Sequence, residues 1–402
     1  MAKVNNHYTG CGCAGGDVIT NTGEEVTEGR RKQKIYNDFL GRPVKEQVLN
    51  WDSSVYSTKI STYNTKDQIV NVKTYQGAET SDGSCPTGTC QLTTMDYDGH
   101  GRVWKHHTPE MDTNTFAIYE YYADDKIYIS TDARRAKSTY TYNNRGLNTK
   151  IDYAAPTGNT TMPVPVSPEF TYDAAGNRLT MADESGTMSY EYNTLSQLTK
   201  ETKTYSGLSN SYPINYAYNS TGQLQSVTDP WNGVVSYSYN KLGRLNSMTG
   251  SGFTDSSTGS VGTFISASEY RAWGAIKSIT YGNQVQLSME YNNRLLPASY
   301  EVGNLSGPNS TTISKGSEYS YYNDGQTSFV DSLSDNKFDR AYKYDHAARI
   351  TQATTGNEAN GGTTADGPYK QTFSYNVWTN TTSTTDRYWT ESPVSTGFSF
   401  TN

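Results

Sequence analysis

The sequence has little of what marks several classes of protein. Its four cysteines in 402 residues are too few for a disulfide scaffold. No run of about 18 apolar residues is present, so we expect no membrane span, and the first residues lack the apolar stretch of a signal peptide. The 33 Lys and Arg and 40 Asp and Glu form no basic cluster. This balance, with a net charge of −7, argues against nucleic acid as a partner.

Aliphatic side chains are also scarce, while tyrosine is abundant. Hydrophobic residues make up only 34% of the chain, but 34 of the residues are Tyr. Disorder usually combines low hydrophobicity with high net charge, and the net charge here is small. We therefore expect a folded chain with a tyrosine-rich core.

A tyrosine followed by Asp or Asn recurs along almost the whole sequence. From Tyr122 onward, successive anchors lie between 20 and 31 residues apart, with short and long spacings alternating. Tyr122 and Tyr270 keep the register without the acidic or amide neighbour. The clear structural anchors are Tyr36, Tyr63, Tyr97, Tyr142, Tyr172, Tyr192, Tyr218, Tyr239, Tyr291, Tyr322, Tyr344 and Tyr375.

A turn signature follows most anchors. In Tyr97-Asp98-Gly99-His100-Gly101, the Asp and the second Gly stand three residues apart, as in type I turns. Glycine accepts a positive φ without steric cost. Weaker copies carry Asp67, Ser196 or Ala348 at the glycine position. The predicted turn glycines are Gly101, Gly146, Gly176, Gly222, Gly243 and Gly274.

Before the turns the pattern has period two. Pairs such as Tyr216/Tyr218 and Tyr237/Tyr239 place two aromatic rings on one face of a strand. Each unit thus predicts strand, tight turn, strand. Fourteen units give about 28 strands, and open twisted sheets rarely exceed about ten strands without curling. The predicted fold class is all-β: consecutive antiparallel hairpins that coil as a β-spiral into a hollow shell or part of one.

The domain organisation follows from the repeat. Residues 1–35 fit it poorly and are expected to be irregular or edge strands, and residues 36–402 form the array, truncated at its C-terminal end. Segments 79–90, 158–168, 250–263, 303–316 and 355–368 are rich in Gly, Ser, Thr, Pro and Asn and predict longer loops at one end of alternate hairpins.

The motif Tyr-Asp-x-x-Gly-Arg/Asn/Gln-Leu/Val resembles the RHS/YD-repeat family. Tyr172-Asp-Ala-Ala-Gly-Asn-Arg-Leu179 and Tyr239-Asn-Lys-Leu-Gly-Arg-Leu245 are close to its consensus, and the resemblance covers about residues 36–380. It implies a strip of hairpins forming a hollow shell. In RHS toxins such a shell encloses a C-terminal effector, and in teneurins it forms an extracellular barrel. The family's self-cleaving core is not found, since Asp229-Pro230 lies in the middle of the array.

Four sets of residues are candidates for a disulfide, a metal site, catalysis or ligand binding. Cys85 and Cys90 could form a disulfide, join Cys11 and Cys13 in a poorly spaced metal site, or stay free. Adjacent His106 and His107 would point to opposite strand faces. Carboxylate pairs such as Asp124-Asp125 and Asp183-Glu184 could serve a glycosidase or bind Ca²⁺ weakly, but loops supply such pairs by chance. The tyrosine ladders could bind sugar or unfolded polypeptide, or simply stabilise the sheet.

Two functions remain from this reading. The first is a non-enzymatic wall fragment, without a cofactor, that encapsulates a C-terminal toxin or another polypeptide cargo of a larger parent, or pairs with another shell segment. The second is a cell-surface adhesion or carbohydrate-binding module with Trp231 or Trp273 as glycan contacts. Exposed edge strands would favour self-association. The resemblance favours a secreted or cell-surface location as part of that parent.

Overall fold

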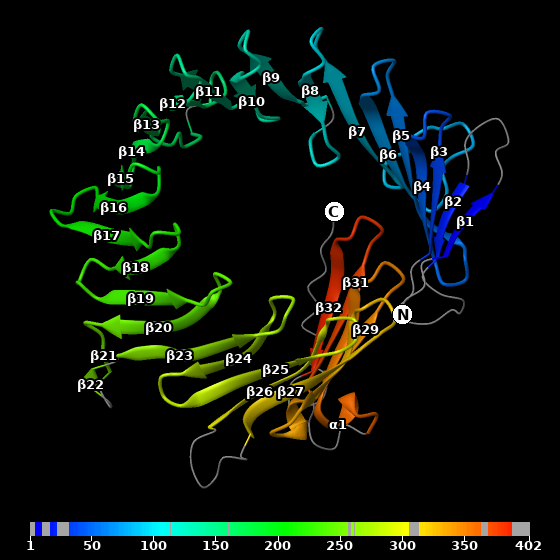
Figure 1. Ribbon diagram of the computed structural model, residues 1–402. Coiled ribbons are helices and arrows are strands. Elements are labelled where there is room, and N and C mark those ends of the chain that lie inside the picture. Colours follow the sequence, from blue (N-terminus) through cyan, green and yellow to red (C-terminus); the bar gives the residue numbers. More distant parts are fainter. Residues whose placement is uncertain are drawn as a thin grey trace. The chain divides into compact units, whose positions relative to one another are not determined.

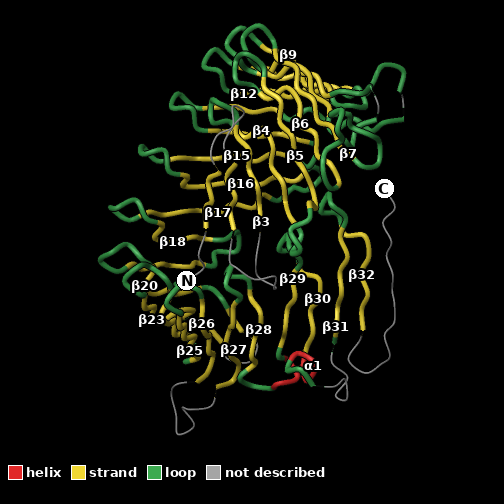
Figure 2. Tube along the Cα trace, turned by 90° about the vertical axis from the view of Figure 1, so that its right-hand side faces the viewer, coloured by secondary structure: helices red, strands yellow, loops and turns green. Residues whose placement is uncertain are grey.

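The computed structural model describes residues 5–9, 17–21, 32–112, 114–159, 161–255, 259–260, 262–304, 313–362 and 369–387. Strand accounts for 56% of the structure and helix for 2%, and Figure 2 shows how few segments are helical. The chain forms two compact units. The first comprises Met1–Thr93, Arg271–Ser278 and Gln284–Asn402, and the second Thr94–Tyr270 and Ile279–Asn283.

The first unit contains two separate runs of strands, and within each run the strands follow one another in the chain (Figure 1). The 3₁₀ turn η1 (Asn336–Phe338) and the short helix α1 (Gly356–Ala359) interrupt the second run. The strands of the first unit are β1 (Asn5–Thr9), β2 (Asp17–Asn21), β3 (Lys32–Asn37), β4 (Pro43–Leu49), β5 (Val55–Tyr63), β6 (Ile69–Gln76), β25 (Val285–Tyr291), β26 (Pro297–Asn304), β27 (Ile313–Tyr321), β28 (Thr327–Ser332), β29 (Arg340–Tyr344), β30 (Ile350–Thr355), β31 (Lys370–Tyr375) and β32 (Thr381–Arg387).

The second unit is one uninterrupted succession of strands. Strands β7 (Cys90–Tyr97) and β24 (Ile276–Tyr281) contain residues of both units. The others are β8 (Val103–His107), β9 (Ala117–Tyr121), β10 (Ile127–Thr131), β11 (Lys137–Tyr142), β12 (Asn148–Ala154), β13 (Glu169–Tyr172), β14 (Arg178–Asp183), β15 (Gly186–Tyr192), β16 (Leu198–Tyr205), β17 (Ser211–Tyr218), β18 (Leu224–Thr228), β19 (Val234–Tyr239), β20 (Leu245–Ser251), β21 (Thr254–Asp255), β22 (Gly259–Ser260) and β23 (Thr263–Tyr270).

Strands that follow each other in the chain pair antiparallel. In the hairpin of β19 and β20, Tyr237 lies opposite Met248, and the register shifts by one residue at Tyr239. The same shift occurs where β17 meets β18 and where β29 meets β30. Each shift is the bulge that a type I turn followed by a left-handed residue produces in a hairpin. The predicted all-β succession of antiparallel hairpins is confirmed.

Burial is shallow in most strands and deepest in β4–β6. Thr58 is fully buried, and Tyr75 and Leu49 are nearly so. The Gln47 amide donates to the Thr58 hydroxyl, which in turn donates to the Gly77 carbonyl at 2.8 Å. Polar groups inside this cluster are therefore hydrogen-bonded to one another, as burial requires.

The long connections lie where the sequence places irregular segments. Residues 77–89 join β6 to β7 and residues 155–168 join β12 to β13, whereas most of 303–316 and 363–368 lie outside the described residues. The division at residue 35 stays a prediction; β2, before it, pairs with β3, which crosses it. No helix in the described ranges is long and apolar enough to cross a membrane.

Candidate functional site

Most turns that follow an anchor are capped by one carboxylate or amide side chain; the turns that open at Tyr122, Arg271 and Tyr322 keep the backbone bonds without it. In the turn that opens at Asp98, the Asp98 carboxylate accepts from the backbone N–H groups of His100 and Arg102, both at 2.9 Å. The Asp98 carbonyl accepts from Gly101 N–H at 3.0 Å. Asn219 and Asn240 make the same contacts through their amide oxygens. Asp and Asn are thus interchangeable because both supply the capping oxygen.

The fourth residue of each turn is left-handed. The residues at this position in three weaker copies, Asp67, Ser196 and Ala348, have φ values of 60–66°. Leu295 and Thr379 adopt the same conformation, at 61° and 71°, and neither was expected there. The predicted turn glycines all have positive φ: Gly101 (87°), Gly146 (74°), Gly176 (95°), Gly222 (82°), Gly243 (74°) and Gly274 (103°).

Three predicted anchors, Tyr36, Tyr122 and Tyr322, are displaced by one residue. The turn expected after Tyr122 opens at Tyr122 itself, so Tyr121 occupies that anchor position. The first turn opens at Asp38, so the last residue of β3 is Asn37 and not Tyr36. The turn predicted to follow Tyr322 opens at Tyr322 itself, because Gly325 lies three residues later. Tyr321 therefore occupies the anchor position. The Tyr322 hydroxyl donates instead to the carbonyl of Tyr342 at 3.0 Å.

Ten anchor tyrosines share a hydrogen bond that the sequence does not reveal. Each hydroxyl donates to the backbone carbonyl of the first residue after the preceding turn of this series, on the neighbouring strand, at 2.5–3.0 Å. The pairs are Tyr63 with Pro43, Tyr121 with Val103, Tyr172 with Asn148, Tyr218 with Leu198, Tyr239 with Leu224, Tyr270 with Leu245, Tyr291 with Ile276, Tyr321 with Pro297, Tyr344 with Thr327 and Tyr375 with Ile350.

This hydroxyl bond explains why the repeat uses tyrosine. The ring covers the sheet, and the hydroxyl satisfies a carbonyl next to the bulge, where the regular ladder is interrupted. Phenylalanine would cover the same surface without tying one hairpin to the preceding one. The remaining clear anchors, Tyr97, Tyr142 and Tyr192, also end their strands, and burial raises the pKa of Tyr142 and Tyr192.

The residue after the left-handed position joins neighbouring turns. The Gln197 amide donates to the Gly222 carbonyl at 3.0 Å, and that of Gln223 to the Gly243 carbonyl at 2.9 Å. Arg102 bridges two turns: it pairs with Asp98 in its own turn and with Asp125 in the next, the latter at 2.7 Å. Its guanidinium also lies 4.5 Å from the ring centre of Tyr121. Long side chains with several donors suit this position because each contacts two turns.

Charge reinforces the turns that open with aspartate. Hydrogen bonds from the backbone of Arg102, together with the Arg102 side chain, lower the pKa of Asp98 to about 2. The side chain of Asn177 lowers the pKa of Asp173. Both carboxylates are ionised at neutral pH, in the form that accepts hydrogen bonds best.

Within the first unit, side chains from distant parts of the sequence meet. Arg349 donates from its Nη2 to the Tyr56 hydroxyl at 3.0 Å, across 293 residues. The His346 ring lies edge-on to Tyr56, with ring centres 4.2 Å apart, and burial lowers the pKa of His346. The contact joins β5 to the turn between β29 and β30.

The structure places a disulfide between Cys85 and Cys90, with Cα atoms 5.0 Å apart. It closes part of the loop between β6 and β7, and Cys90 is buried at the start of β7. Cys11 and Cys13 lie outside the described residues. In the described part of the chain, no three His, Cys, Asp or Glu side chains gather in a way that could hold a metal ion.

The other chemically suggestive residues have structural contacts. His107 Nδ1 lies 2.8 Å from the Thr115 carbonyl oxygen, and His106 stacks on Tyr119. Asp183 caps Ser185 N–H at 2.8 Å, as expected of a hairpin turn. Asp229 accepts from Trp231 and Gly233 N–H groups at 2.8 and 2.7 Å. The aspartate of the Asp-Pro string thus caps a turn of the same design as Asp98.

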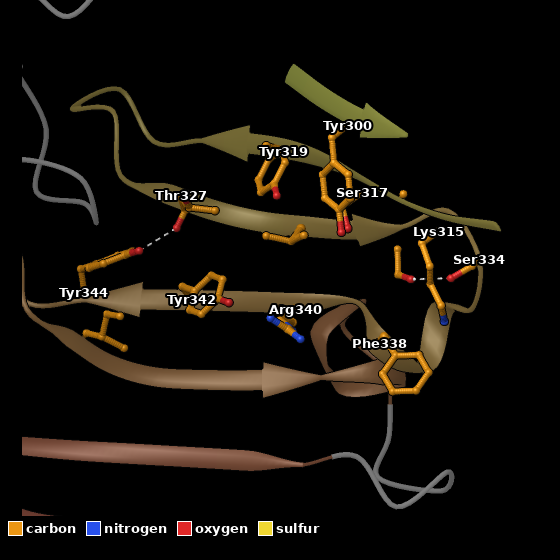
Figure 3. A pocket seen from close by; sticks show the side chains of 14 residues that line it. Tyr300, Lys315, Ser317, Tyr319, Thr327, Ser334, Phe338, Arg340, Tyr342 and Tyr344 are labelled. Carbon is orange, nitrogen blue, oxygen red and sulfur yellow. Dashed lines mark hydrogen bonds between the residues drawn. The ribbon is translucent and has the colours of Figure 1, made fainter. Parts of the chain in front are cut away.

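A cleft of about 530 Å³ lies on the aromatic face of β26–β30 (Figure 3). Five aromatic rings line it: Tyr300, Tyr319, Phe338, Tyr342 and Tyr344. Lys315 and Arg340 are its only charged residues, and hydroxyl groups of serine and threonine complete the wall. A second, smaller cleft of about 380 Å³ lies in the second unit beside residues 162–165. Both adjoin connections at the hairpin ends opposite the tyrosine-led turns.

Comparison with known proteins identifies the repeat. Residues 218–252 match the model of the RHS Repeat family. The chain carries an RHS repeat. The matched stretch contains Tyr218, Gly222, Tyr239 and Gly243, and the resemblance read from the sequence is confirmed. No curated protein matches the chain.

Solved structures share the fold over nearly the whole RHS-repeat chain. TcdB2-TccC3 is 13% identical, with a TM-score of 0.60 over 89% of this chain and 22% of that one. TcdB2-TccC3 without its hypervariable C-terminal region is 12% identical, with a TM-score of 0.57 over 93% and 26%. A Photorhabdus luminescens Tc holotoxin pore with a TccC3 mutation gives 12% and 0.58 over 95% and 26%. This chain spans about a quarter of their length.

Proposed function

We propose that the chain is a non-enzymatic wall segment of an RHS-like shell that encloses a polypeptide cargo. The observation that carries the proposal is the likeness to TcdB2-TccC3 over 89–95% of this chain. One of those structures lacks a hypervariable C-terminal region, so TccC3 has a variable segment beyond its constant part. By this reading the parent of the present chain is exported and carries its cargo in the same way.

In this proposal the wall encloses its cargo as a continuous layer and does not recognise one particular cargo sequence. The tyrosine hydroxyls and the Gln and Arg side chains of the turns bond to backbone carbonyls of neighbouring hairpins, so successive hairpins are joined into one layer. Tyrosine rings offer apolar area, while serine and threonine between them keep the surface wettable. Such a surface holds an unfolded chain loosely, which suits a cargo that must later leave.

Protease protection tests this function directly. A fluorescent, permanently unfolded polypeptide, such as reduced and carboxymethylated α-lactalbumin, is digested with and without an excess of the protein. We expect the polypeptide to survive several-fold longer with the protein, and native folded α-lactalbumin to be unaffected. An unchanged digestion rate of the unfolded form would contradict the proposal.

Exposed tryptophans favour a second candidate, a glycan-binding adhesion module. Trp231 is 77% exposed at the tip of a turn, and Trp273 is 51% exposed with its ring edge-on to Tyr291. A glycan array compares the natural protein with the Trp231→Ala variant. Saturable binding that the variant loses would support adhesion, while absence of binding to any glycan would leave only the wall.

A further inference from the structure

The basic side chains that line the cleft of β26–β30 lie on one face of the sheet, and the carboxylates of β27 and β28 lie on the other. Lys315 and Arg340 line the cleft, and no Asp or Glu does, although the protein carries a net charge of −7. The carboxylates Glu318 and Asp331 are cross-strand partners on β27 and β28. Because side chains alternate along a strand, they lie on the face opposite Tyr319 and Val330, which line the cleft. The cleft is a positive site on a negative protein.

The two cations are available to a ligand. Neither Lys315 nor Arg340 forms a salt bridge with a described residue, and both side chains are exposed. Lys315 Nζ lies 5.9 Å from the centre of the Phe338 ring. In Figure 3 the Lys315 side chain extends toward Phe338, and the Arg340 side chain lies beside Tyr342. Arginine presents a planar fork that fits a carboxylate, and lysine adds a point charge.

Aromatic rings form the rest of the wall. The ring centres of Tyr300 and Tyr319 are 6.3 Å apart, and Phe338 is 52% exposed although it is wholly apolar. Burial raises the pKa of Tyr319, so its hydroxyl is protonated at neutral pH. Among the described residues that line the cleft there is no tryptophan, Asn, Gln, Asp or Glu. The lining thus has few of the planar polar groups that could fix the many hydroxyls of a sugar, but ample apolar area beside positive charge.

We propose that this cleft binds an extended polypeptide segment in which a carboxylate side chain lies next to aromatic or aliphatic residues. The carboxylate contacts Arg340 and Lys315, and the apolar side chains rest on Phe338, Tyr300 and Tyr319. The inference rests on the proposed function for the nature of the partner, and it goes further by naming the chemistry of the cargo segment that is held and the place that holds it.

Fluorescence anisotropy with synthetic peptides tests the cleft. The probe is a labelled peptide that alternates Glu with Phe and Leu, and its matched control carries Gln in place of each Glu. We expect the Glu peptide to bind at least tenfold more tightly than the Gln peptide, and this difference to shrink as salt is raised. The variants Arg340→Ala and Lys315→Ala should each weaken binding about tenfold.

Lys343→Ala is the matched control variant. Lys343 lies on the same strand as Arg340, is exposed, and is absent from the cleft lining. It removes one positive charge without touching the cleft, so binding of the Glu peptide should be unchanged. Equal binding of the Glu and Gln peptides, or equal losses in Lys343→Ala and Arg340→Ala, would overturn the proposal. Tighter binding of a uronic-acid oligosaccharide than of the Glu peptide would also overturn it.

The outcome separates this inference from the function on which it rests. Protection of an unfolded polypeptide without any preference for the Glu peptide would refute the cleft and leave the wall. Binding of the Glu peptide at Arg340 without protection of unfolded polypeptide would support the cleft as a docking site and refute enclosure.

Discussion

The two ends of the hairpins differ in how uniform their connections are. One end, here called the tyrosine end, comprises the turns that open at Asp38, Asn64, Asp98, Tyr122, Asn143, Asp173, Asn193, Asn219, Asn240, Arg271, Asn292, Tyr322, Asp345 and Asn376. All of them close with the same two backbone hydrogen bonds. At the opposite end, the turns that open at Asn50, Asp132 and Asp229 close with the same pair of bonds. The other connections there range from the two-residue Glu184–Ser185 to the fourteen-residue segment 155–168. The turn geometry is therefore uniform at the tyrosine end and variable at the opposite end.

This difference indicates where the chain can acquire new contacts. At the tyrosine end, most turns have a capping side chain, and many are also held by the next tyrosine or by a side chain of a neighbouring turn. At the opposite end, loops such as 333–339 and 155–168 border the two clefts. A rigid end that positions a variable end is how many binding proteins are arranged.

The largest loss of stability is expected from a substitution at Gly186, the first residue of β15, which directly follows the connection from β14 at the opposite end. Its φ is 130°, and a Cβ there would lie 2.0 Å from the Thr204 carbonyl oxygen. We expect Gly186→Ala to lower the free energy of unfolding by at least about 3 kcal/mol. Gly207→Ala, also at positive φ but with no atom within 4 Å, should cost about 1 kcal/mol. Denaturant unfolding measures both, and equal losses would show that close backbone approach at Gly186 is unimportant.

A pair of glycines inside one turn sharpens the rule for the tyrosine end. Gly101 has a φ of 87°, whereas Gly99, two residues earlier, has no positive φ and open space around its Cα. We expect Gly101→Val to lower the free energy of unfolding by about 2 kcal/mol and Gly99→Val to change it by less than about 0.5 kcal/mol. A thermal midpoint equally lowered in both variants would speak against the turn geometry.

Acid should affect aspartate turns more than asparagine turns. The pKa of Asp98 is depressed to about 2, below the roughly 3.9 of an unfolded chain. Its contribution to stability is therefore present above about pH 4 and is lost as the pH falls toward 2. Asp98→Asn keeps the capping oxygen, as in Asn219 and Asn240, but does not titrate.

The variant's unfolding midpoint in urea, followed from pH 5 to pH 2, should therefore fall less steeply than that of the natural protein. Asp125→Asn is the control, because Asp125 accepts from Arg102 in the neighbouring turn without capping the Asp98 turn. Parallel curves for Asp98→Asn and the natural protein would contradict the assignment of the lowered pKa to the turn.

The hairpins could be predicted because their signals are local. The Tyr-x-Tyr pattern sets the strand face, and an Asp or Asn three residues before Gly sets the turn, all within about ten residues. The predicted register is wrong at Tyr36, Tyr122 and Tyr322, where the turn opens one residue away from the expected position. At Tyr322 the spacing to Gly325 is the better signal, because only the left-handed position has a strict steric requirement.

The contacts that join hairpins could not be read from the sequence. The hydroxyl of Tyr239 reaches a carbonyl 15 residues away, and that of Tyr270 one 25 residues away, because the connections between them differ in length. The cleft depends in addition on how β26–β30 align and on the loop that presents Phe338. The serine-rich segment before Phe338 predicts neither the alignment of these strands nor the position of Phe338.

The hydroxyl bond of the anchors is the central claim, and one matched pair of variants tests it. Tyr239→Phe removes the hydrogen bond to the Leu224 carbonyl, while Tyr237→Phe, on the same strand face, removes a hydroxyl for which no such bond exists. Urea unfolding at neutral pH should show Tyr239→Phe less stable by about 1 kcal/mol and Tyr237→Phe unchanged within about 0.3 kcal/mol. Equal stability of the two variants would mean that the tyrosines act only as surface cover and do not tie the hairpins together.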